Sequence, residues 1–195
     1  MFRKEGANMT DEYEISIKVT ELEIAQQGTS ADEVVIAVSP AFGTKIKKSI
    51  VDIGLDKILK ELCAGIEEEG MKYRFVKVYN STDLAIIASQ GSKLSGSGIC
   101  VGLQSRGTTV IHQRDLVPLD NLELFPQSPL YDEKIYRKIG KNAAKYAKGE
   151  NPEPVEILND FMVPSKYLVK STLLHFKEGE MMDKSKKAVN VDITF

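Results

Sequence analysis

The residues of this chain that could take part in chemistry gather between residues 94 and 129. This segment is rich in neutral hydrogen-bonding side chains, interleaved with glycines and prolines: Gln104, Ser105, Thr108, Thr109, Gln113, Asn121, Gln127 and Ser128. Such a surface suits a large neutral ligand with many amides, or a polar subunit interface. Arg106 lies in a tight turn that also exposes backbone N–H groups, so it could bind a single phosphate.

No catalytic constellation accompanies this segment. The two histidines, His112 and His175, form no Ser-His-Asp, Cys-His or HExxH pattern, and each is predicted to be a strand or surface histidine. The glycines of residues 96–102 precede a strand instead of opening a helix, which favours a turn and close packing over a dinucleotide-binding loop. We therefore expect neither catalytic residues nor metal ligands in this chain.

Composition narrows the functional classes further. The chain has 26 basic and 28 acidic residues and a net charge of −2, which argues against general binding to nucleic acids or anionic membranes. Its two cysteines, Cys63 and Cys100, have no CxxC spacing, as is typical of proteins in a reducing cytosol and not of zinc modules. No apolar run approaches the length of a membrane span.

Strands and helices must position the polar segment, and their patterns alternate along residues 33–112. Apolar residues at steps of three or four predict helices over residues 55–69 and 132–148, and a hydroxyl and carboxylate cap predicts another after residues 81–83. β-Branched and aromatic runs predict strands over residues 13–19, 34–38, 73–79, 99–103, 108–112, 172–176 and 188–194. This alternation is typical of a layered α/β domain. We expect an N-terminal arm over residues 1–30 and a single α/β domain over residues 31–195, with a C-terminal extension.

The lysines at 134, 138, 141, 145 and 148 form a basic stripe along the second long helix. A solvated outer face is the simplest interpretation. The alternative is contact with an acidic partner or a phosphate.

Four strings, LSGSG at 94–98, SRGTTVIHQ at 105–113, NLELFPQ at 121–127 and IGKNAAKYA at 139–147, closely resemble the medium (beta) subunit of adenosylcobalamin-dependent diol and glycerol dehydratases. The resemblance covers roughly residues 30–178. It implies a three-layer α/β/α fold with a mixed, mostly parallel sheet of about five strands.

The resemblance also implies a division of labour. The large subunit, a β/α barrel, would convert the diol to an aldehyde and water by a radical mechanism. This chain would be a non-catalytic subunit that holds the nucleotide side of base-on adenosylcobalamin against the large subunit. The absence of a D-x-H-x-x-G motif agrees with a cofactor that keeps its own base on cobalt. The implied partners are the large and small subunits, in a dimer of heterotrimers, and the reactivating factor.

The family's cofactor contacts fall on eight residues of this chain: Asp83, Arg106, Thr108, Leu119, Asn121, Pro126, Gln127 and Ser171. Arg106 stands where a lysine is common, which keeps the charge but changes its geometry. Pro164 stands where the family usually has an arginine, so we expect Lys166 or Arg106 to supply the lost charge.

Two alternatives stay open. The chain could be the small subunit of the dehydratase-reactivating factor, or a nucleotide-binding domain of another family. The latter would need a glycine loop between strand and helix. The sequence does not decide between glycerol and propane-1,2-diol as substrate. The short N-terminus favours a free cytoplasmic complex over a bacterial microcompartment.

Overall fold

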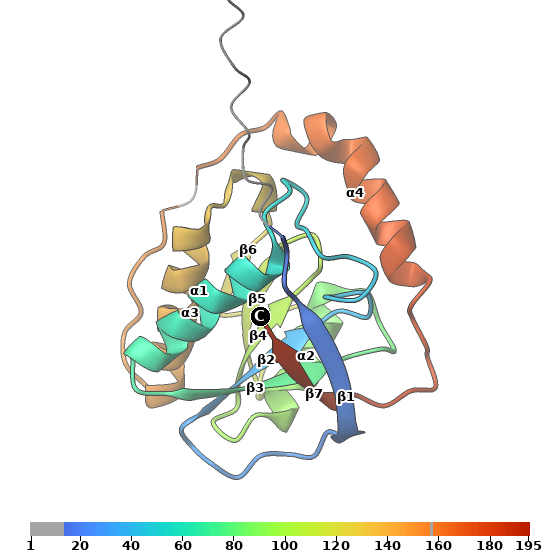
Figure 1. The fold of residues 1–195 in the computed structure, drawn as a ribbon. Coiled ribbons are helices and arrows are strands. Elements are labelled where there is room, and N and C mark those ends of the chain that lie inside the picture. Colours follow the sequence, from blue (N-terminus) through green and yellow to red (C-terminus); the bar gives the residue numbers. More distant parts are fainter. Residues whose placement is uncertain (1–13, 157) are drawn as a thin grey trace, which may run out of the picture.

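The computed structural model describes residues 14–156 and 158–195 and contains one seven-stranded mixed sheet, in the order β1-β7-β3-β2-β4-β5-β6 (Figure 1). The strands are β1 (Lys18–Ile24), β2 (Glu33–Val38), β3 (Lys72–Lys77), β4 (Ile99–Leu103), β5 (Thr109–Gln113), β6 (Glu123–Phe125) and β7 (Val189–Thr194). The helices are α1 (Leu55–Glu68), α2 (Leu84–Leu94), α3 (Glu133–Lys148) and α4 (Val163–Gly179), with a short 3-10 turn, η1 (Ser128–Leu130).

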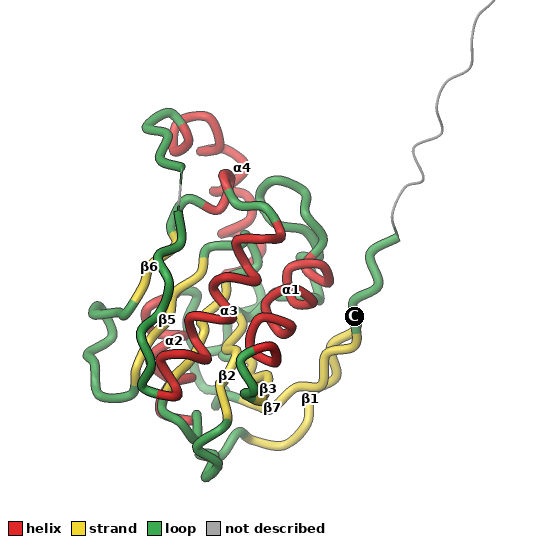
Figure 2. Tube along the Cα trace, turned by 90° about the vertical axis from the view of Figure 1, so that its left-hand side faces the viewer, coloured by secondary structure: helices red, strands yellow, loops and turns green. Residues whose placement is uncertain are grey.

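The central strand β2 shows why the molecule is layered. Val34, Ile36 and Val38 contribute to a core shared with α1 and α3, whereas Val35 and Ala37 contribute to a second core that includes Ile87 of α2. Strand β2 is therefore buried on both faces, with α1 and α3 on one side of the sheet and α2 on the other. Figure 2 shows α1 and α3 side by side. The predicted α/β class, its three layers and a mixed sheet are confirmed.

The sheet differs from the prediction in strand number and direction. It has seven strands instead of about five, and parallel pairing is confined to β2 with β3 and β2 with β4. The remaining pairs, β1–β7, β3–β7, β4–β5 and β5–β6, are antiparallel, so "mostly parallel" is wrong. The short turn between β4 and β5 requires those two strands to be antiparallel, since a connection of a few residues can join only antiparallel strands.

The predicted helices over residues 55–69 and 132–148 are confirmed as α1 and α3, and the helix predicted after residues 81–83 is confirmed as α2. Asp132 accepts a hydrogen bond from the Ile135 backbone N–H at 3.1 Å, and Asp83 accepts one from Ala85 at 2.8 Å at the start of α2. Gly149, with a φ of 71°, ends α3 in the left-handed conformation that favours glycine.

Helices α1 and α3 pack closely because each has a glycine at their crossing. A Cβ added at Gly65 would clash with the backbone of Arg137, and one added at Gly140 would clash with the Leu62 carbonyl oxygen. The backbones are therefore in contact, with no side chain between them.

Three lysines of the basic stripe on α3 form ion pairs with acidic residues of this chain: Lys141 with Glu68, Lys145 with Glu153 and Lys148 with Glu69.

The C-terminal third contains the main error of the sequence prediction. Residues 172–176, predicted as a strand, lie within α4, which runs along one end of the sheet (Figure 1). Only Val163 and Glu178 of α4 are buried. The run Thr-Leu-Leu-His-Phe is short, apolar and aromatic, which is a pattern that a strand and a helix share.

The two end strands lie together at one edge of the sheet. β1 pairs with β7, and the predicted strand over residues 188–194 is confirmed as β7. β1 begins at Lys18, later than the predicted strand over residues 13–19, of which residue 13 lies outside the described residues. Within residues 14–156 and 158–195, no helix combines the length and apolar character that crossing a membrane requires.

Candidate functional site

The candidate site lies at the carboxyl ends of the parallel strands β2, β3 and β4. In open α/β sheets this edge forms a crevice where helices on opposite faces diverge, and ligands bind there. The segments that follow these strands, residues 39–43, 79–83 and 104–108, approach one another at this edge. The Ser39 hydroxyl, for example, accepts a hydrogen bond from the Ser105 backbone N–H at 3.0 Å.

The turn that carries Arg106 is held from both sides. The Gly107 N–H donates to the Gln104 carbonyl at 2.8 Å, and the Gln104 N–H donates to the Thr108 carbonyl at 3.0 Å. Gly107 has a φ of 102°, which a side chain rarely adopts. The buried Tyr136 hydroxyl of α3 donates to the Gly107 carbonyl at 2.9 Å. The turn is therefore tied to the core.

Tyr136→Phe tests this tie. We expect the free energy of unfolding to fall by about 1 kcal/mol, because the variant removes one buried hydrogen bond without creating a large cavity. The loss stays moderate since Thr109 Oγ1 also donates to the Gly107 carbonyl at 3.0 Å. Urea unfolding of the two proteins measures the difference, and equal stability would show that the hydroxyl does not support the turn.

Two cavities open on this edge and meet at the turn. We call the first, of about 570 Å³, the Asp83 cavity. It is lined chiefly by Asp83, Leu84, Gln104, Leu119, Asn121 and His175. We call the second, of about 430 Å³, the Gln127 cavity, and it is lined chiefly by Ile50, Pro126, Gln127, Pro164, Tyr167 and Ser171. Arg106 and Thr108 line both cavities, so a ligand that fills both must pass them.

Arg106 is the only arginine or lysine among the described residues that line these two cavities. Its Nε donates to Gln104 Oε1 at 2.9 Å and its Nη1 to Ser171 Oγ at 3.2 Å. Burial lowers the pKa of Arg106 and the nearby Glu178 carboxylate opposes that shift, but a guanidinium stays charged at neutral pH. The group is thus oriented by two neutral partners and keeps its charge available to an anion.

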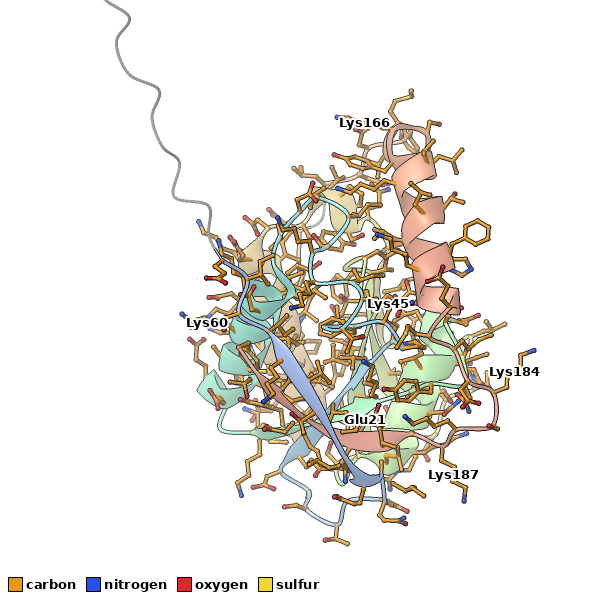
Figure 3. All side chains as sticks on the ribbon, turned by 45° about the vertical axis from the view of Figure 1, so that its right-hand side comes forward. Glu21, Lys45, Lys60, Lys166, Lys184 and Lys187 are labelled. Carbon is orange, nitrogen blue, oxygen red and sulfur yellow. The ribbon has the colours of Figure 1, made fainter. Side chains whose placement is uncertain are left out.

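The structure brings together eight of the nine predicted binding residues. Asp83, Leu119 and Asn121 line the first cavity, Pro126, Gln127 and Ser171 line the second, and Arg106 and Thr108 line both. The ninth residue, Lys166, lines neither cavity. Its Nζ lies 5.7 Å from the centroid of the Tyr167 ring, and Figure 3 shows Lys166 near the N-terminal end of α4.

Pro164 lines the Gln127 cavity directly. It lies in the first turn of α4, where proline fits because the first helical N–H groups have no intrahelical partner. Because proline carries no charge, Arg106 is the cationic side chain that borders this cavity.

Two of the predicted binding residues also have structural roles. Asp83 caps α2, as described above, and the Gln127 side chain ties down the segment before α4. Its Oε1 accepts from the Asp160 N–H at 3.2 Å and its Nε2 donates to Asn159. Substitutions at these two positions would disturb the walls of the cavities as well as any ligand contact.

Sequence reasoning did not place Tyr167 or His175 of α4 among the binding residues, although both line the cavities. Tyr167 and His175 lie four residues before and after Ser171, so all three share one face of α4. Their four-residue spacing could have indicated a shared helix face. The sequence analysis instead predicted a strand over residues 172–176, in which these residues would not share a face.

The other potentially reactive side chains are occupied or inert. His112 is buried in β5, where its Nδ1 lies 3.2 Å from Ser92 Oγ and its Nε2 lies 3.3 Å from the Val117 carbonyl, so the predicted strand histidine is confirmed. Burial raises the pKa of the Cys63 and Cys100 thiols to about 12, which leaves them protonated at neutral pH.

A buried lysine lies behind the site. Lys77 ends β3, is fully buried, and donates from Nζ to the Phe42 carbonyl at 3.1 Å. Burial lowers its pKa to about 8, and the carboxylates of Glu178 and Glu21 only partly oppose this shift. The folded protein therefore binds this proton less tightly than the unfolded chain does.

The contribution of Lys77 to stability should consequently rise with pH above pH 8, whereas the raised thiol pKa values of Cys63 and Cys100 act in the opposite direction. Between pH 8 and pH 10 the unfolded chain keeps the Lys77 proton that the folded protein releases, which adds roughly 2 kcal/mol to the free energy of unfolding. Urea unfolding of the protein and of Lys77→Met at both pH values isolates this contribution, because the thiols are present in both proteins. A stability difference between the two proteins that does not change with pH would show that Lys77 does not titrate in this interval.

A family model described as "Dehydratase medium subunit" matches residues 39–153, more than half of the chain. The fold is similar to a solved structure titled "Glycerol dehydratase reactivase", with a TM-score of 0.50 and 16% identity over 66% of this chain and 97% of that one. Another, titled "Structure of diol dehydratase-reactivating factor complexed with ADP and Mg2+", has a TM-score of 0.47 and 21% identity over 63% and 95% of the two chains. At 16% identity the first of these structures bears on the fold alone, whereas the match to the family model covers the turn and seven of the nine predicted binding residues. The chain therefore belongs to the dehydratase medium-subunit family.

Proposed function

We propose that this chain is the medium subunit of a coenzyme B12-dependent glycerol or propane-1,2-diol dehydratase. In that role it binds the nucleotide side of base-on adenosylcobalamin against the large subunit. The observation that carries the proposal is the pair of cavities that meet at Arg106, because a ligand with a phosphate between two uncharged ends would fit such a site.

The lining residues match the parts of this ligand. Arg106 offers the charge for the phosphate, and Thr108 and Ser171 offer hydroxyls beside it. Asn121 and Gln104 offer amides to the carboxamide side chains of the corrin, and Pro126 and Leu119 offer apolar contact. The bound cofactor would supply radical chemistry through its cobalt–carbon bond. The residues of this chain bind and orient it, and none acts as acid, base or nucleophile.

The outer face of α4 supports a large partner beside the cavities. Val169, Leu173 and Phe176 are exposed on this helix, and Phe161 just before it is 87% exposed. Neighbouring apolar side chains that stay in water are typical of a protein interface. We propose that the large subunit covers these apolar side chains. The small subunit would complete a heterotrimer, and two heterotrimers would form a dimer in the cytoplasm. The reactivating factor would be a further partner of this complex.

The second candidate is the small subunit of the reactivating factor. The similarity in fold to the reactivase structure favours it, since nearly all of that chain is matched. Affinity purification separates the two candidates: a dehydratase subunit should co-purify with a barrel subunit and a small third chain.

Reconstitution tests the proposed function directly. The chain is co-expressed with the large and small dehydratase subunits, and adenosylcobalamin-dependent aldehyde formation is measured from glycerol and from propane-1,2-diol. We expect turnover only when this chain is present. Full turnover by the other two subunits alone would contradict the proposal, and the ratio of the two rates would identify the preferred diol.

A further inference from the structure

We propose that His175 is a further binding residue, which forms a hydrogen bond to a polar oxygen of the ligand in the Asp83 cavity. The inference rests on the proposed function. It adds a contact to the same site from a residue that neither the family motifs nor the sequence pattern indicated.

The first observation is the set of α4 residues that line the cavities. Tyr167, Ser171 and His175 follow one another at four-residue steps on one side of the helix, whereas Val169 and Phe176 are exposed on the opposite side. Val163, Pro164 and Leu168 add apolar contacts to the Gln127 cavity. Among the described residues of α4, His175 is the one that lines the Asp83 cavity, so the helix presents a polar side chain there.

The second observation is how contacts on either side of His175 attach α4 to the ends of the strands. The Glu178 carboxylate, buried one turn beyond His175, accepts a hydrogen bond from the Ala41 N–H at 2.6 Å. One turn before His175, Ser171 accepts a hydrogen bond from Arg106. Both contacts tie α4 to the strand ends and hold the intervening position toward the Asp83 cavity. His175 also lines a narrow gap beside Arg106 and Glu178.

The third observation is the contrast between the two histidines. Both ring nitrogens of His112 have partners within hydrogen-bonding reach in the core. The ring of His175 makes no hydrogen bond or ion pair to any residue in the described part of the chain, although it lines the same cavity as Asp83, Gln104 and Asn121. An imidazole always offers at least one N–H donor. Phosphate and carboxamide oxygens, the polar groups of the proposed ligand, accept from such a donor.

The test uses the reconstituted three-subunit complex and cyanocobalamin, which keeps the nucleotide side of the cofactor and needs no turnover. Equilibrium binding is followed by absorbance after dialysis. We expect His175→Ala to weaken binding about tenfold, equivalent to about 1.4 kcal/mol. His175→Gln, which keeps an N–H donor, should stay within about threefold of the unmodified complex. Lys177→Ala, an exposed position on the same helix, is the matched control and should bind as the unmodified complex does.

The outcomes separate this inference from the proposed function. If Arg106→Ala weakens binding and His175→Ala does not, the histidine contact is wrong and the function stands. If neither variant weakens binding, the proposed function fails as well. If His175→Ala disturbs assembly, His175→Gln and His175→Met, which are similar in size, answer the question. Tighter binding by the glutamine variant supports the contact, and equal binding by both overturns it.

Discussion

Arg106→Ala should weaken equilibrium binding of cyanocobalamin to the reconstituted complex by about 10- to 150-fold. The guanidinium borders both cavities and is oriented by Gln104 and Ser171, so its removal leaves the proposed phosphate without a charged donor. Hydrogen bonds to charged groups contribute roughly 1.5–3 kcal/mol, which gives this range. Assembly of the three subunits, followed by size-exclusion chromatography, should not change.

Two companion variants make the result specific. Arg106→Lys keeps the positive charge, so it should retain most of the affinity. Lys166→Ala tests the other candidate for the charge that Pro164 lacks. Because Lys166 lines neither cavity, we expect its loss to change affinity less than the loss of Arg106 does. Unchanged binding by both alanine variants would show that neither residue compensates for Pro164.

Gly140→Val should destabilise the protein by about 3 kcal/mol or more. Any Cβ at this position meets the Leu62 carbonyl oxygen of α1, so the two helix backbones must move apart and lose the packing between them. Urea unfolding followed by circular dichroism measures the loss, which should appear as a lower midpoint.

Gly179→Ala is the matched control for this prediction. It adds a methyl group at the end of α4, where no atom lies within 4 Å of the added Cβ, so its free energy of unfolding should stay within about 0.5 kcal/mol. Equal effects at the two glycines would mean that the close crossing of α1 and α3 does not limit stability.

The helix α1 and the strand β2 could be predicted because the spacing of their apolar residues matches the residues that are buried. Leu55, Ile58 and Leu62 fall on one face of α1 and are all fully buried. The β-branched run of β2 has the continuous apolar pattern of a strand covered on both faces. In both cases the apolar residues face the core, so pattern and structure agree.

Helix α4 was not predictable in the same way, because most of its large apolar residues are exposed. Val169, Leu173 and Phe176 lie in solvent, whereas the polar residues Ser171 and His175 line the cavities. Periodicity identifies an element by the face it buries within its own chain, and α4 buries little. The turn at Arg106 could be located from its glycine and the neighbouring polar residues. The cavities on either side of it could not be predicted, because residues of α4 form part of their walls.

The antiparallel pairing of β1 with β7 has a consequence for how the chain folds during synthesis. Lys18 lies opposite Thr194, so all the other described strands lie between these two neighbours along the chain. The parallel centre of the sheet, from β2 to β4, involves residues 33–103 alone and can assemble while translation continues. β1 emerges from the ribosome first and yet obtains its hydrogen-bonded neighbour last, when β7 has been released, and contacts between such distant residues form slowly. Until then this strand is an unpaired edge, exposed to association with other nascent chains.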